Sequence, residues 1–229
     1  MTLYETIFAR RSVRQYADGV MDAAELEAIR AHVAAAPQLA GQSARFGFVG
    51  RDQLKGGMAP HAILAFADEN DAAFVNIGFV LQGVDLWLQS HGYGSIWCGM
   101  AKPEDKAEGY RILLGFGKTN LPMRGGEGDF KRKKLSDISD TDNAVARAAR
   151  LAPSAVNFQP WKLAFSPGKV TICANVRGIG RVLPGRLYLF DLGIVAKHVQ
   201  VALAHEGKTV TGIEVRGKGR DCRIEIEYK

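Results

Sequence analysis

The sequence has little cysteine, no targeting signal and no metal-ligating pattern. Its three cysteines, Cys98, Cys173 and Cys222, are far apart and odd in number, and none forms a CxxC pair, which argues against a disulfide framework or a structural zinc site. The N-terminal stretch MTLYETIFARRS has no apolar core of the kind found in a signal peptide, and no apolar run comes near the ~18 residues of a membrane span. We therefore expect a reduced, cytoplasmic protein without a membrane segment or a metal.

The sequence also lacks the bias of a disordered chain, because 47% of its 229 residues are hydrophobic and 24% are charged. Its net charge of +6 is concentrated in two short clusters, at 10–14 and 131–134. A nucleic-acid surface would interleave exposed aromatics with Lys and Arg across a face, and the sequence shows no such pattern. We expect no nucleic-acid partner. Each cluster is either a solvated charge run or a local anion site.

An internal repeat is visible when IGFVLQGVDLWLQSHG (77–92) is set over LGIVAKHVQVALAHEG (192–207) without a gap. Matching glycines and aliphatic residues recur at one displacement, and each stretch ends at a glycine suited to a left-handed helix cap. A second pair, AIRAHVAAAP (28–37) and AVARAARLAP (144–153), lies at nearly the same displacement. Duplication explains both pairs; chance matching of Ala-rich helices is the alternative.

The repeat predicts an α+β fold made of two related halves, about 1–137 and 138–229. In the first half, hydrophobic periodicity and turn residues predict helices at 2–9, 22–35 and 71–91 and strands at 45–50, 61–67, 94–99 and 110–116. Asp22 and Glu25 form a predicted capping box. The second half repeats this order in a shorter form. We expect the long helices at 74–91 and 191–206 to pack together, which makes the chain a single-domain pseudo-dimer.

Three segments carry candidate chemistry. ARRSVRQY (9–16) places three arginines and a serine within five positions, and guanidinium groups with a hydroxyl can cradle phosphate. DFKRKKLSDIS (129–139) is a second basic run, and LAPSAVNFQPW (151–161) is a loop without helical or alternating rhythm. Alone, each basic run is more typical of solvated surface.

The chain contains the motifs RRSVRQY, the long apolar helix leading into GYGSIWCGM, ILLGFGK with FKRKKLSDI, and APSAVNFQPW. Taken together, these motifs resemble the FMN-dependent nitroreductase superfamily over nearly the whole chain. The tandem arrangement resembles members in which two halves are fused. This resemblance implies that FMN binds between the halves. The phosphate would be held by four residues of the first half, Arg10, Arg11, Ser12 and Arg14, and Lys131 or Arg132 would close over it.

The resemblance also assigns the flavin ring to the loop in the second half. Ser154 and Asn157 would bind the ring, Pro153 would shape the loop, and Gln159 would support it together with Pro160 and Trp161. The backbone at Cys98 and Gly99 would direct an amide N–H toward flavin N5. Four aromatic residues either contact the flavin or belong to the core: Tyr16, Trp97, Phe158 and Trp161.

Each half lacks what the other supplies. The first half has APQLAGQSARF where the second has APSAVNFQPWK, and the second half has no RRS segment. We therefore expect one FMN per chain and an oxidoreductase that moves hydride from NADH or NADPH, through the flavin, to an electron-poor acceptor such as a nitroaromatic or quinone. No protein side chain is expected to be catalytic in itself. A flavin-binding protein without turnover, for storage or sensing, is the alternative, as is another flavin chemistry such as dehalogenation. One chain suffices for the site, so a monomer is compatible with it, and further association stays open.

Overall fold

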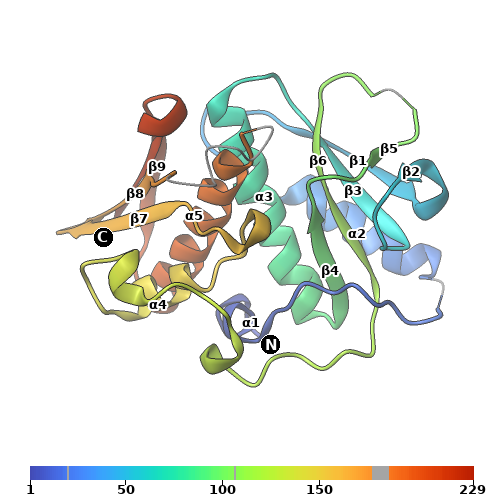
Figure 1. Ribbon diagram of the computed structural model, residues 1–229, viewed down its shortest axis with the longest axis horizontal. Helices are drawn as coiled ribbons and strands as arrows, with labels where there is room; N and C mark the ends of the chain where they lie inside the picture. The colour runs from blue at the N-terminus through green and yellow to red at the C-terminus, as the bar shows by residue number, and fades with distance from the viewer. Residues whose placement is uncertain (20, 106, 177–185) are drawn as a thin grey trace.

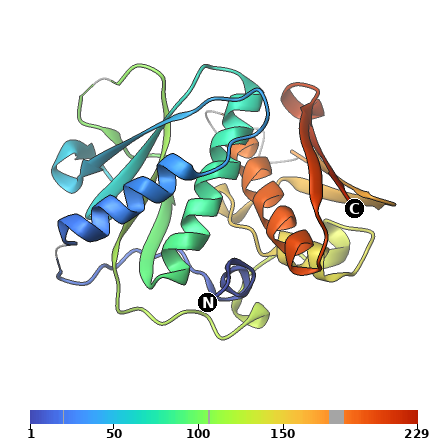
Figure 2. The same ribbon diagram turned by 180° about the vertical axis from the view of Figure 1, so that it is seen from behind.

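The computed structural model describes residues 1–19, 21–105, 107–176 and 186–229. Two antiparallel sheets lie at opposite sides of the molecule, and two long helices, α3 (Asp71–Ser90) and α5 (Leu187–His205), lie between them (Figures 1 and 2). Nearly all buried apolar side chains of both halves join one continuous core around these helices. The chain therefore forms a mixed helix and sheet structure around a central helix pair.

The first half contains three helices and one four-stranded sheet. Its elements are α1 (Leu3–Ala9), α2 (Ala23–Ala35), β1 (Arg45–Gly50), β3 (His61–Phe66), α3, β4 (Tyr93–Cys98) and β6 (Tyr110–Lys118), with a two-residue pair formed by β2 (Leu54–Lys55) and β5 (Lys102–Pro103). The sheet order is β1-β3-β6-β4, and every neighbouring pair is antiparallel. All the helices and strands predicted in this half are present with ends within two residues, and the Asp22–Glu25 capping box forms.

The second half repeats that arrangement in fewer residues. Its elements are α4 (Ala144–Arg150), β7 (Trp161–Ser166), β8 (Lys169–Ala174), α5, β9 (Val210–Arg216) and β10 (Arg223–Tyr228). The sheet order β7-β8-β10-β9 matches that of the first sheet strand for strand, again with antiparallel neighbours. Helix α5 begins at Leu187, four residues before its predicted start. Gly92 and Gly207, which follow α3 and α5, both adopt the left-handed conformation expected of helix caps.

The crossing of α3 and α5 depends on two glycines at equivalent positions of the sequence repeat. A Cβ at Gly78 would overlap the carbonyl oxygen of Phe190, and a Cβ at Gly193 would overlap that of Val75. Val75 and Phe190 are themselves equivalent in the repeat, so each long helix makes the same close contact with the other. Because neither glycine has a side chain, the two helix backbones approach each other closely at this crossing.

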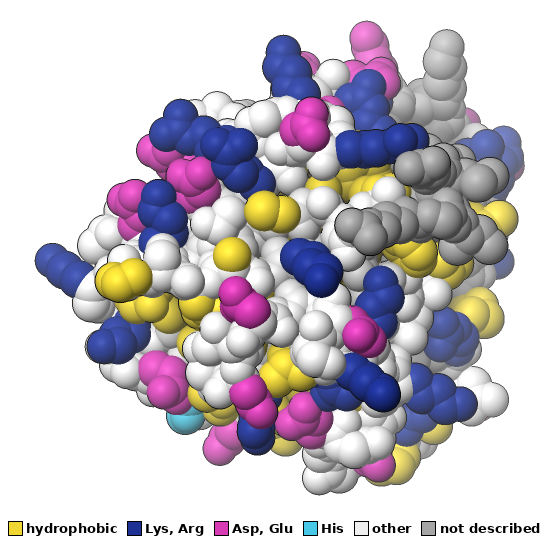
Figure 3. Space-filling model, turned by 60° about the vertical axis from the view of Figure 1, so that its left-hand side comes forward, with side chains coloured by type: hydrophobic (Ala, Val, Ile, Leu, Met, Phe, Trp, Pro, Cys, Tyr) yellow, Lys and Arg dark blue, Asp and Glu magenta, His cyan; other side chains and the backbone are white. Residues whose placement is uncertain are grey.

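Both long helices reach the length and hydropathy of a membrane span, which the sequence analysis missed. The apolar windows of α3 and α5 are 78% and 72% buried inside the protein, so each resembles a core helix of a globular fold. Both helices are this hydrophobic because they pack against the two sheets and against each other. On the face shown in Figure 3, Lys and Arg side chains are interspersed with Asp and Glu, so the positive charge does not form one basic surface there.

Candidate functional site

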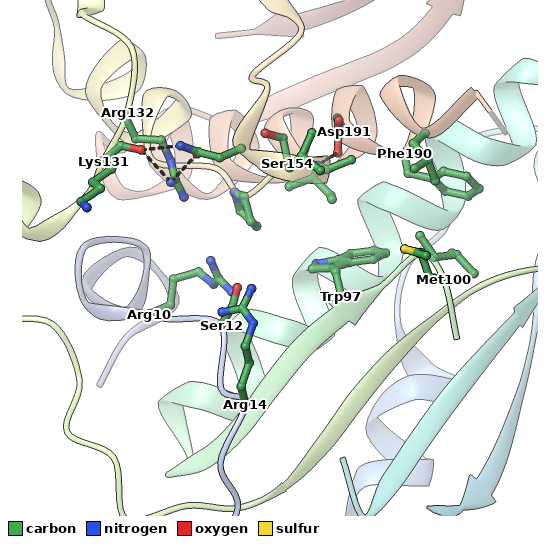
Figure 4. Close-up of a pocket in the computed structure, with 18 of the residues that line it drawn as sticks. Arg10, Ser12, Arg14, Trp97, Met100, Lys131, Arg132, Ser154, Phe190 and Asp191 are labelled. Atoms are coloured by element: carbon green, nitrogen blue, oxygen red, sulfur yellow. Dashed lines mark hydrogen bonds between the residues drawn. The ribbon is translucent and has the colours of Figure 1, made fainter. Parts of the chain in front are cut away.

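A cavity of about 590 Å³ lies where the two halves meet, within the size range of ligand sites. Its walls come from the N-terminal segment, the end of β4, the segment after β6, the loop before β7 and the first turns of α5 (Figure 4). Nine of the twelve predicted site residues line it: Arg10, Ser12, Arg14, Gly99, Lys131, Arg132, Pro153, Ser154 and Asn157. Arg11, Cys98 and Gln159 do not.

The N-terminal segment presents alternate residues to the cavity. After α1 the chain is extended alongside β4, where Ser12 pairs with Ser95 and the Val13 N–H donates to the Ser95 carbonyl. In an extended chain, successive side chains point to opposite sides. Arg10 and Arg14 therefore line the cavity with Ser12. Arg11 points away and donates from Nη1 to the Pro122 carbonyl at 3.0 Å, which corrects its predicted place beside the phosphate.

Arg10 is buried at the base of the cavity and held by Asp85 of α3. Its Nε lies 2.8 Å from Asp85 Oδ2, and both side chains are at most 1% exposed. Asp85 also accepts hydrogen bonds from Gln82, Gln89 and Ser95 at 2.9, 3.1 and 2.6 Å. The Arg10 Nη2 atom, in contrast, is buried without a hydrogen-bond partner among the described residues. A buried guanidinium with a free donor at a cavity wall is suited to an anion.

More positive charge comes from the segment that follows β6 and crosses to the second half. Lys131 and Arg132, which were predicted to close over the phosphate, line the cavity from this segment, and so does Arg124, which the sequence did not point to. Burial lowers the pKa of Arg132 to about 10, assisted by Arg10 and Arg124. Burial and the same neighbouring Arg10 also lower the pKa of Arg124. Arg124 and Arg132 are still charged at neutral pH, and the repulsion among the neighbouring guanidinium groups favours binding of an anion. Asp129 is the carboxylate nearest to this group along the segment.

The loop before β7 forms the opposite wall and has a strained backbone. Val156, Asn157 and Gln159 have φ values of 46°, 59° and 50°; for a β-branched residue such as Val156 this conformation is a true outlier. Such strain often occurs at functional sites. Ser154 Oγ accepts from the Gln159 N–H at 2.9 Å, which leaves its own hydrogen free to donate.

Hydrogen bonds from this loop fix the position of the basic segment. The Asn157 amide, predicted to bind the ring, accepts from Arg132 Nη1 at 2.7 Å and donates to the Lys131 carbonyl at 2.8 Å. Gln159 is buried, and its Oε1 accepts from the Lys133 N–H at 2.9 Å. Gln159 therefore stabilises the loop on the side away from the cavity and does not line it.

The end of β4 shows the same alternation as the N-terminal segment. Trp97 and Gly99 line the cavity, whereas the side chain of Cys98 lies on the other side of the strand, against a small separate core. The Cys98 thiol therefore lies outside the cavity. The prediction for Cys98 concerned its backbone and does not depend on the thiol. Of the four candidate aromatics, Trp97 lines the cavity; Trp161 is fully buried in the core, and Tyr16 and Phe158 are not part of the lining.

Helix α5 supplies residues that the sequence analysis did not identify. Phe190 and Ile194 form an apolar wall, and Asp191 lies between them. Burial raises the pKa of Asp191 to about 8, partly offset by the hydrogen bond from the Ala155 N–H. The available signal was a single acidic residue within the apolar stretch LYLFDLGI.

The cavity therefore has two chemically different ends, and Figure 4 shows both in one view. At one end lie Arg10, Arg14, Lys131 and Arg132; at the other lie Trp97, Phe190 and Met100. Among the described residues, no group of three His, Cys, Asp or Glu side chains could hold a metal ion. This arrangement suits a long ligand with an anionic group at one end and a flat, largely apolar group at the other.

The fold and this two-ended cavity define an α+β protein with a nitroreductase-like fold. Residues 2–203 match the family described as "Putative TM nitroreductase", so the chain belongs to that family, and membership supports an oxidoreductase. A nitroreductase structure from Thermotoga maritima shares 18% identity and a TM-score of 0.72, with 99% of this chain and 94% of that chain covered. This likeness confirms the predicted α+β nitroreductase-like fold.

Smaller nitroreductase structures overlap only part of the chain. One from Desulfovibrio desulfuricans, in complex with FMN, has 20% identity and a TM-score of 0.47, covering 62% of this chain and 96% of its own. Another from Desulfitobacterium hafniense, with bound FMN, has 18% identity and a TM-score of 0.43, covering 58% and 100%. No curated protein matches the chain.

Proposed function

We propose that this protein is an FMN-dependent oxidoreductase that transfers hydride from NADH or NADPH to an electron-poor acceptor, such as a nitroaromatic or a quinone. The observation that carries the proposal is the two-ended cavity, in which residues from both halves of one chain form an anion-binding end and a flat apolar end. Family membership and the FMN named in the two structures above support the choice of flavin.

The residues present fit FMN in their chemistry. The unpartnered Arg10 Nη2, with Ser12, Arg14 and Lys131, would hold the phosphate by charge-assisted hydrogen bonds. The ring would lie at the apolar end, near Trp97 and Phe190. When bound, FMN supplies the two-electron chemistry, which no side chain of the protein provides.

The protein's own part is to bind and orient the flavin and to leave one side of it accessible. Asp85 fixes the Arg10 guanidinium, and Asn157 fixes the segment that carries Lys131. Met100 and Val156 line the cavity although they are 97% and 76% exposed, so they mark its mouth. An apolar mouth beside the ring end is suited to flat, ring-containing reductants and acceptors, and this access favours turnover over storage.

We propose one FMN per chain because the equivalent position in the other half has different chemistry. Applying the displacement of the repeat, Asp85 corresponds to Gln200 and Gln82 to Lys197. The hydrogen bond from Gln82 to Asp85 has its counterpart in one from Lys197 Nζ to Gln200 at 2.7 Å. The carboxylate that holds Arg10 is thus replaced by an amide. These differences support a duplicated chain that keeps one of two ancestral sites.

The test is an absorbance titration. The purified protein is loaded with FMN and desalted, and NADH or NADPH is added without oxygen. About one equivalent of flavin per chain, bleached by a pyridine nucleotide and reoxidised by a nitroaromatic or a quinone, is the expected result. Flavin that is retained but never bleached would indicate a binding protein without turnover, and failure to retain flavin would refute the proposal.

A further inference from the structure

The side chain of Asp191 has one satisfied oxygen and one free oxygen. Oδ1 accepts from the Ala155 N–H at 3.0 Å and so holds the loop before β7 against α5. Oδ2 is buried and has no hydrogen-bond partner among the described residues. The side chain is 3% exposed and lines the cavity near its apolar end (Figure 4). Loop support alone explains Oδ1 but not Oδ2.

The other half contains an internal control for this position. Asp191 corresponds to Asn76 in the repeat, and Ala155 corresponds to Leu39. Asn76 Oδ1 accepts from the Leu39 N–H at 2.8 Å, which is the same loop-supporting hydrogen bond. An amide therefore suffices to support the loop, and the fold does not require a carboxyl group here.

The second atom of the two side chains differs in what it meets. Asn76 Nδ2 donates to Gln38 Oε1 at 2.8 Å, so in the first half this position carries a donor with a partner inside the protein. Gln38 corresponds to Ser154, which is shorter and lines the cavity. In the second half, the equivalent atom, Asp191 Oδ2, has no such partner among the described residues, and the cavity lies where that partner would be.

We infer that Asp191 is a cofactor-binding residue, whose protonated Oδ2 donates a hydrogen bond to an acceptor atom on the ring of the bound flavin. This inference rests on the proposed function. A carboxyl group without a cation beside it stays neutral when buried. Flavin rings carry carbonyl oxygens and ring nitrogens that accept hydrogen bonds, and such contacts tune the ring.

Among the residues that the structure describes, no charged neighbour supplies an alternative partner. The other charged residues that line the cavity come from the N-terminal segment and from the segment after β6: Arg10, Arg14, Arg124, Asp129, Lys131 and Arg132. Helix α3, which packs against α5, contributes no charged side chain to the lining, and neither does the loop from Ser154 to Asn157. The pKa of Asp191 is raised by burial and lowered by the Ala155 N–H alone.

The test compares the FMN dissociation constant of the wild type and Asp191→Asn between pH 7 and pH 9, by flavin fluorescence. If only the protonated carboxyl binds, a pKa of about 8 gives about tenfold weaker binding at pH 9 than at pH 7. Asp191→Asn keeps both the acceptor for Ala155 and a donor, as Asn76 does. It should bind within about threefold of the wild type at pH 7 and show no pH step. Asp129→Asn, at the other cavity carboxylate, should keep the step.

Four outcomes separate failure of the inference about Asp191 from failure of the proposed function. An equal pH step in the wild type and in Asp191→Asn would overturn the role of Asp191, as would a wild type without a step. Asp191→Ala lacks the donor, so binding as tight as that of Asp191→Asn at pH 7 would also overturn it. If the wild type fails to bind FMN at pH 7, the proposed function itself fails.

Discussion

Replacing Gly193 by alanine should destabilise the protein, because this glycine allows α5 to cross α3. The added Cβ would lie 2.7 Å from the Phe79 backbone nitrogen and would overlap the Val75 carbonyl oxygen. Both neighbours are main-chain atoms of a helix and cannot rotate aside. Overpacking of this kind costs about 3 kcal/mol at the upper end of its usual range, and the higher helix propensity of alanine returns about 1 kcal/mol.

The expected net loss of free energy of unfolding is therefore about 2 kcal/mol. In a chain of this size, it corresponds to a fall in Tm of about 4–8 °C, since each kcal/mol shifts Tm by about 2–4 °C. FMN affinity should fall as well, because Phe190, Asp191 and Ile194 line the cavity from the same turn of α5. Thermal unfolding followed by circular dichroism, with and without FMN, measures both effects.

Gly83→Ala provides a matched control on α3. There the added Cβ would lie 3.3 Å from Cε of Lys197, a side-chain atom that needs to shift by only a few tenths of an ångström. The helix-propensity gain of up to about 1 kcal/mol should then dominate, and Tm should rise by about 2 °C. Equal Tm values for the two variants would refute the view that contact between the helix backbones determines the crossing.

Two further predictions concern the cationic end. Arg14→Ala should weaken FMN binding about tenfold or more, the value of one charged hydrogen bond, whereas Arg11→Ala should change it less than about threefold because Arg11 points away from the cavity; equal losses in the two variants would contradict the alternation of this segment. Asn157→Ala should weaken FMN binding by about tenfold, because it removes the hydrogen bonds to Arg132 and to the Lys131 carbonyl; unchanged affinity in equilibrium dialysis would show that these contacts do not position the basic segment.

The fold could be predicted from local sequence signals. Strand β1 was found at its observed limits, and α3 ended one residue before its predicted end, because each has a clear hydrophobic pattern and a capping or turn residue. The β2–β5 pair was missed, since two residues per strand leave no periodicity. The repeat correctly indicated that the two long helices pack together.

The site could be predicted only where a motif carried it. The segment RRSVR predicted four site residues by its resemblance to the family; Arg10, Ser12 and Arg14 line the cavity, whereas the extended backbone turns Arg11 away. Arg124 gave no signal, because it lies in a Gly-rich loop whose path depends on the Arg124 N–H bond to the Ala9 carbonyl. Asp191 was missed for a similar reason: its importance depends on a cavity that tertiary packing creates.

The segment that follows β6 joins the two halves of the chain, and this affects how the cavity assembles. Because both walls belong to one polypeptide, the cavity forms in a unimolecular folding step, and dilution does not take the walls apart as it would in two associating subunits. A substitution also changes one wall only, whereas in two identical subunits it would alter two sites at once. Each half of this chain is consequently free to specialise, as the pairs Asp191 and Asn76, and Asp85 and Gln200, already illustrate.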